Sequence, residues 1–282
     1  MFEVPPEVWT ACLFVVPWVV LGWQPWRSKE PRTGAVANAL APVLAAGMVL
    51  HGLHAIPDLP PTYSKDWLPI AIPIAGVLGV LSVRRFGLAT LGTALLVMGW
   101  TWFAFSRKRE TRWAEDHALL RTLALCGAGA IQAVMLCAGS RRIAKGPGPA
   151  LALLVTLSVT GWLVGNQFFA SGGAVLGACS AGVGPLVALA WLRKDWNVLA
   201  GWLPPLALLT FAVPVHCWAD NLSRSASLGG GPCTLLVLAP LAALLPGEGR
   251  RVEALRWILT IAVLAGAVAW GWPGSSADPY GY

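Results

Sequence analysis

Charged residues are scarce in this chain. Only 12% of its 282 residues are Asp, Glu, Lys or Arg, whereas 56% are hydrophobic. An average soluble protein is about 25% charged, because its water-exposed surface needs a polar coat. The composition therefore excludes an ordinary soluble domain and predicts a polytopic membrane protein whose surplus apolar surface faces lipid.

Several motifs of catalysis and cofactor binding are also missing. The six cysteines form no CxxC or CxxCH pair, which argues against a dithiol redox centre, a zinc ribbon and covalent haem. There is no phosphate-binding loop, no dinucleotide fingerprint and no GxSxG elbow. The sequence therefore identifies no cofactor. An enzyme is the least favoured functional class, because no nucleophile and base stand at a recognisable spacing.

Long apolar runs are what the chain has in abundance. A membrane-spanning helix needs about 20 residues, with a lower limit of about 17, and the third and ninth runs are near or below that limit. We expect a single integral membrane domain over residues 1–282, an all-α bundle of about ten transmembrane helices, or eight or nine if short runs do not cross. The runs are 8–26, 35–57, 67–83, 86–106, 117–139, 149–170, 173–192, 198–218, 232–246 and 255–273.

The basic residues predict how the chain threads the membrane. Thirteen of the twenty Lys and Arg fall in loops that share one side of the membrane if the ten-helix count holds. By the positive-inside rule this side is cytoplasmic, which predicts an N-out, C-out protein in a bacterial cytoplasmic membrane. One loop dissents, since Arg107, Lys108, Arg109 and Arg112 fall on the outer side, where Glu110 and two further acids largely neutralise them.

The net charge of +7 does not indicate nucleic acid as a partner. The basic residues form short clusters between apolar runs, with no stripe interleaved with aromatic side chains. The expected partner is the lipid bilayer. Tryptophan supports this prediction, because eleven of the sixteen Trp lie at or near the predicted helix ends, where indole prefers the headgroup layer.

The sharpest chemical signal lies within residues 35–66. The apolar run there ends with His51, His54 and Asp58, whose spacings of three and four residues put them on one face of a helix. Titratable side chains in a membrane helix are costly and mark a function or a partner. Together these three side chains are suited to one proton, one cation or one partner helix.

The predicted topology brings further polar side chains to the same outer level. His216 and Asp220 are four residues apart and share a helix face. Arg121 lies one turn inside its run and either snorkels to the headgroups or pairs with an acidic side chain. The complete set is His51, His54, Asp58, Arg121, Asn166, Gln167, His216 and Asp220.

Two interpretations of this outer polar set stay open. The first is an outward-facing cavity that binds a proton, a cation or a small polar solute, since imidazole titrates near neutral pH. The second is that the groups are hydrated among headgroups or satisfy one another as interhelical hydrogen bonds. Imidazole and carboxylate also suit zinc or copper, but the pattern lacks the specificity of HExxH, and we assign no metal ligand.

Two cysteines are candidates for a disulfide. Cys217 and Cys233 flank a polar loop on the predicted outer side, where an oxidising compartment would permit a bond between them. Equally, both can be small apolar residues with free thiols.

Two functions follow from these patterns. The first is a small transporter or permease for an unidentified small solute or ion, working by alternating access coupled to protonation of His51, His54 or Asp58. The alternative is a non-catalytic structural subunit that packs against partner membrane subunits in a larger complex. The transporter leads because transport is the commonest task of compact ten-helix chains, and no residue pattern decides between the two.

Overall fold

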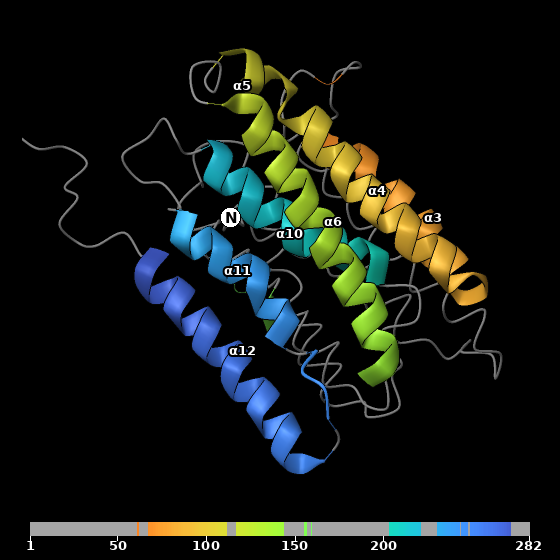
Figure 1. Cartoon of the computed structure of the whole chain (residues 1–282), viewed down its shortest axis with the longest axis vertical. Coiled ribbons are helices and arrows are strands. Elements are labelled where there is room, and N and C mark those ends of the chain that lie inside the picture. The colour runs from red at the N-terminus through yellow and green to blue at the C-terminus, as the bar shows by residue number, and fades with distance from the viewer. Residues whose placement is uncertain are drawn as a thin grey trace, which may run out of the picture.

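The computed structural model describes residues 61, 67–111, 117–143, 155–156, 159, 203–220, 230–242, 244–247 and 249–271. Over these residues the chain is helical and has no strand, which confirms the all-α class for this part of the chain (Figure 1). The helices are α3 (Leu68–Arg84), α4 (Phe86–Ala104), α5 (Ser106–Thr111), α6 (Ala118–Ile143), α10 (Leu203–Asp220), α11 (Gly230–Ala242) and α12 (Arg250–Gly271).

Predicted apolar runs coincide with these helices to within a few residues. The runs 67–83, 86–106, 117–139, 198–218, 232–246 and 255–273 become α3, α4, α6, α10, α11 and α12. The runs 8–26, 35–57 and 173–192 lie outside the described residues, as does all of 149–170 except Val155, Thr156 and Val159. The total of about ten helices therefore stays a prediction.

Three of the described helices are long and apolar enough to cross a membrane. They are Phe86–Ala104, Ala118–Gly139 and Arg250–Gly271. The two runs that the sequence marked as short are short helices here, α3 with 17 residues and α11 with 13. At about 1.5 Å per residue, α11 is about 20 Å long, less than the roughly 30 Å thickness of a bilayer's hydrocarbon core.

Neighbouring helices pack as antiparallel hairpins. The ring of Trp67, just before α3, stacks on Phe103 near the end of α4, with 5.0 Å between centroids. Gly231, at the start of α11, lies against the indole of Trp270 at the end of α12. In Figure 1, α3, α4 and α6 run side by side, and α11 and α12 form a pair at the opposite flank.

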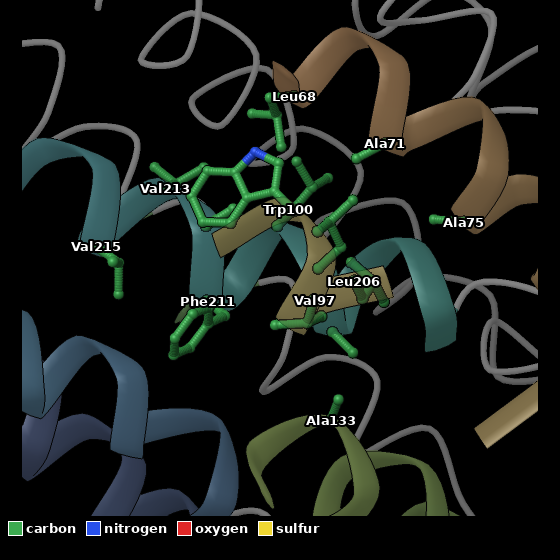
Figure 2. Close-up of a cluster of buried hydrophobic side chains, with 14 of the residues drawn as sticks. Leu68, Ala71, Ala75, Val97, Trp100, Ala133, Leu206, Phe211, Val213 and Val215 are labelled. Carbon is green, nitrogen blue, oxygen red and sulfur yellow. The ribbon is translucent and has the colours of Figure 1, made fainter. Parts of the chain in front are cut away.

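α10 is the central helix. Every residue from Leu203 to His216 is buried, and the helix packs against α3, α4, α6 and α11. A helix that is apolar on all sides must be enclosed by protein or lipid, and here protein encloses it. Figure 2 shows side chains of four helices meeting at α10: Leu68, Ala71 and Ala75 from α3, Val97 and Trp100 from α4, Ala133 from α6, and Leu206, Phe211, Val213 and Val215 from α10.

Two pairs of exposed arginines lie at the same end of the bundle on its opposite flanks, where α4 and α12 begin (Figure 1). We call this end the basic end and define it by Arg84, Arg85, Arg250 and Arg251. The turn between α3 and α4 carries the first two. The end of α6 lies at the same level, and its Gly139 is next to Leu244, which precedes the start of α12. The second pair opens α12.

The opposite end holds the loop whose basic residues dissented from the predicted topology. Part of it is the short helix α5, which the apolar pattern did not predict. The Nη1 of Arg109 donates a hydrogen bond of 2.9 Å to the carbonyl of Trp102, and the guanidinium lies 4.0 Å from the centre of that indole ring. Arg109 thus caps the last turn of α4, where carbonyls lack helical partners.

A proline inside a helix removes one backbone N–H and is expected to kink or interrupt the helix. Pro73 lies inside α3 and Pro214 inside α10, and both helices continue through them. Pro205 lies in the first turn of α10, where an N–H has no intrahelical partner to lose.

Candidate functional site

Five of the predicted site residues lie outside the described part of the chain. They are His51, His54, Asp58, Asn166 and Gln167. The predicted role of the histidine and aspartate triad therefore stays a prediction. The others, Arg121, His216 and Asp220, belong to α6 and α10 and have backbones that the structure places.

His216 is buried near the end of the central helix. Only 4% of the residue is exposed, although imidazole is polar and titratable. Its burial follows from the position of α10, whose apolar surface on every side draws the helix, and His216 with it, into the bundle. Pro214, two residues earlier, removes one backbone N–H from the hydrogen-bond ladder of this turn.

Arg121 lies near the start of α6, at the same end of the bundle as His216, but in a different environment. α6 and α11 both run from this end toward the basic end, and Trp218, near the end of α10, lies beside the start of α11. The side chain of Arg121 is exposed, in contrast to the buried His216. Asp220 ends α10, and its side chain lies outside the described atoms. The structure thus brings Arg121, His216 and Asp220 to one end of the bundle.

The described atoms do not test the predicted disulfide. Cys233 is buried on α11 and forms no disulfide with another described cysteine, and the side chain of Cys217 lies outside the described atoms. A bond between the two stays a prediction.

Gln132 is a buried polar residue that sequence reasoning missed. It lies on α6 with 2% of its surface exposed, and its Nε2 donates a hydrogen bond of 2.9 Å to the carbonyl of Val237 on α11. That carbonyl is three residues before Pro240, in a turn where the helical ladder lacks an N–H. The Oε1 of Gln132 has no hydrogen-bond partner. A carboxamide inside an apolar run was the available signal.

Three buried threonines are polar but satisfied within their own helices. The hydroxyl of Thr93 donates to the carbonyl of Ala89 at 2.7 Å, that of Thr101 to Val97 at 2.7 Å, and that of Thr210 to Leu206 at 2.8 Å. Such bonds to the preceding turn let a hydroxyl enter an apolar bundle at little cost. These side chains add no ligand-binding capacity. Among the described residues, the Oγ1 of Thr260 and the Nε1 of Trp100 are buried without a hydrogen-bond partner.

Metal-binding chemistry finds no support in the described part of the chain, where no three His, Cys, Asp or Glu side chains form a cluster. Protein families, curated proteins and solved structures give no match to this chain. Its chemistry must therefore be inferred from its own side chains. In the described residues these are an imidazole and a carboxamide inside an apolar bundle, which can exchange a proton or hydrogen-bond a polar solute.

Proposed function

We propose that this chain is a small integral membrane transporter for a small polar solute or ion. In this proposal it has about ten helices, lies N-out and C-out in a bacterial cytoplasmic membrane, and opens its polar site to the outside. The observation that supports it best is the buried His216 on the central helix α10. Imidazoles and carboxylates inside membrane bundles are rare and mark ion paths and proton relays.

The position of α10 would let a change at His216 reach much of the described bundle. α10 contacts four other helices, so any change in its tilt changes the packing of most of the described bundle. Pro214 removes one backbone N–H from the helical ladder just before His216, although α10 continues through it.

The sequence-predicted triad completes the proposed site. His51, His54 and Asp58 share a helix face, and in the proposed topology they reach the level of His216. Protonation of one of them would couple solute movement to the proton gradient by alternating access.

Transport by the purified protein tests this proposal. Proteoliposomes would be loaded with a defined mixture of amino acids, nucleosides and small organic cations, a pH gradient imposed, and the retained solutes measured by mass spectrometry. We expect at least one solute to move only with the gradient, and His216→Gln and the combined His51→Ala, His54→Ala, Asp58→Asn variant to slow it at least tenfold. Gly127→Ala, on an open face of α6, is the control and should transport normally.

A structural subunit of a larger membrane complex is the second candidate. It is favoured by α12, which packs against α11 and also exposes large apolar residues, including Ile258 (62%) and Ile261 (57%). Gentle extraction of the tagged chain from native membranes tests it. A stoichiometric partner, together with no gradient-dependent solute movement, would replace the transporter proposal, and a solitary active particle would reject the subunit.

A further inference from the structure

The basic end carries four exposed arginines and, among the described residues, one acidic side chain. Arg84 and Arg85 occupy the turn between α3 and α4, and Arg250 and Arg251 open α12. Of the acidic side chains that the structure describes, only Glu253 lies at this end. The basic end therefore carries an excess of fixed positive charge.

Arg256, close to the basic end, already has a structural role. Arg256 donates to the carbonyl of Leu245 from Nε at 3.0 Å and from Nη2 at 2.7 Å, and to Gly247 at 2.7 Å. Its guanidinium group therefore stabilises the turn between α11 and α12. The four arginines of the basic end are more exposed than Arg256, so their guanidinium groups are available to an external anion.

Apolar side chains rise directly from both arginine pairs. On α4, Leu88, Leu91 and Leu95 are 51%, 57% and 57% exposed and follow one face at spacings of three and four residues. On α12, Leu255 and Ile258 are 48% and 62% exposed and continue the face of Arg251. Each stripe begins about 4 to 6 Å along the helix axis from its arginine.

We propose that the basic end binds anionic phospholipids in preference to neutral ones. At each pair the lipid phosphate binds the two arginines and the acyl chains lie along the adjacent apolar stripe, which is on α4 for Arg84 and Arg85 and on α12 for Arg250 and Arg251. Guanidinium pairs with phosphate through two parallel hydrogen bonds, and a basic side chain near an anionic membrane surface strengthens binding. The occupant is a lipid rather than a free anion because charge and exposed apolar surface are continuous on both helices. This inference rests on the proposed membrane location of the chain and does not depend on transport.

Lipid-dependent stability of the purified full-length protein tests the proposal. Thermal unfolding in a mild detergent would be followed while phosphatidylglycerol or phosphatidylcholine with the same acyl chains is added. We expect stabilisation at lower concentrations of phosphatidylglycerol, and a weakening of its apparent affinity by about fivefold for each arginine removed at low salt. Arg84→Gln/Arg85→Gln and Arg250→Gln/Arg251→Gln should each show this loss.

Matched variants separate the site from net charge and from misfolding. Arg107→Gln/Lys108→Gln removes two charges at the opposite end and should keep the lipid preference. Arg84→Lys/Arg85→Lys keeps the charge and should retain most of it, which also provides a folded variant of the same site. The proposal is overturned if both phospholipids stabilise equally, if the opposite-end variant loses the preference to the same extent, or if glycerol phosphate without acyl chains stabilises as well as the lipid.

Discussion

One glycine, Gly129, allows α6 to approach α4 and α10 closely. Gly129 on α6 faces α4 and α10, and a methyl group there would lie 2.6 Å from Cγ1 of Val97 and 2.8 Å from Cε1 of Phe211. Both neighbours are buried in the core around α10. The three helices therefore meet at a point where no side chain fits on α6.

Adding one carbon at Gly129 should consequently separate these helices. We expect Gly129→Ala to destabilise the protein by about 1 to 3 kcal/mol, the usual penalty for overpacking, seen as a lower unfolding temperature in detergent. Gly127→Ala, two residues away with no atom within 4 Å of the added methyl, should be neutral or slightly stabilising because alanine favours helix. Equal effects of the two changes would contradict the tight contact.

Two substitutions of Gln132 separate the effect of its hydrogen bond from the effect of its volume. Gln132→Ala removes the hydrogen bond to Val237 and leaves a cavity, so we expect a loss of about 1 to 3 kcal/mol. Gln132→Leu removes the same bond but fills the volume and eliminates the unpaired Oε1, so it should be less destabilising. If leucine is as damaging as alanine in the same unfolding assay, the hydrogen bond outweighs packing.

The residue scale is also where the sequence was least informative. His216 was chosen from the sequence for its titratable ring, and its burial depended on which helix became central, which no local pattern encodes. Gln132 and Gly129 were missed because their importance lies in contacts with Val237, Val97 and Phe211, all distant in the chain. Sequence patterns describe one helix at a time, whereas these residues act between helices.

At the scale of elements, the hairpin of α11 and α12 is closed by one side chain. Arg256 binds the carbonyls of Leu245 and Gly247, which belong to the turn where α11 has ended and where carbonyls have no helical partner. Gly247 has a φ of 125°, which a residue with a side chain rarely adopts. The turn therefore depends on both the glycine and the arginine.

Removing the Arg256 side chain should loosen this hairpin. We expect Arg256→Ala to lower stability by about 1.5 to 3 kcal/mol, because charged hydrogen bonds are lost and carbonyls are left without partners. Faster amide hydrogen exchange in residues 244–256 is the direct readout. The control is Arg251→Ala, whose side chain is exposed and which should leave exchange in the turn unchanged. An unaltered turn in Arg256→Ala would contradict the role assigned to it.

The described elements themselves were predictable because hydrophobic length is a local property. The apolar runs gave α3, α4, α6, α10, α11 and α12 to within a few residues at either end. The apolar pattern did not predict α5 because its sequence, SRKRET, is polar. Its Arg, Lys and Glu residues have strong helix propensity. Its position also explains part of the dissenting loop, since Arg109 is held against α4.

At the scale of the whole molecule, the two ends of the bundle make a testable claim about orientation. Arg85 and Arg251 lie at the basic end, while Glu110 lies at the other. Single cysteines would replace each of them in a cysteine-free background. In intact cells we expect a membrane-impermeant maleimide to label Glu110→Cys and to label Arg85→Cys and Arg251→Cys only after the membrane is opened. Labelling of both ends from one side would exclude the arrangement of α3 to α12 as a membrane-crossing bundle.

Central enclosure of α10 has a consequence for the order in which the protein is made. α3, α4 and α6 precede α10 in the chain, while α11 follows it, and synthesis delivers the N-terminal helices first. When α10 is synthesised, three of its four described neighbours have therefore already been made, and only α11 is still to come. A chain truncated after Asp220 would lack the helix that covers one side of α10, and part of the apolar surface of the most buried described helix would be uncovered.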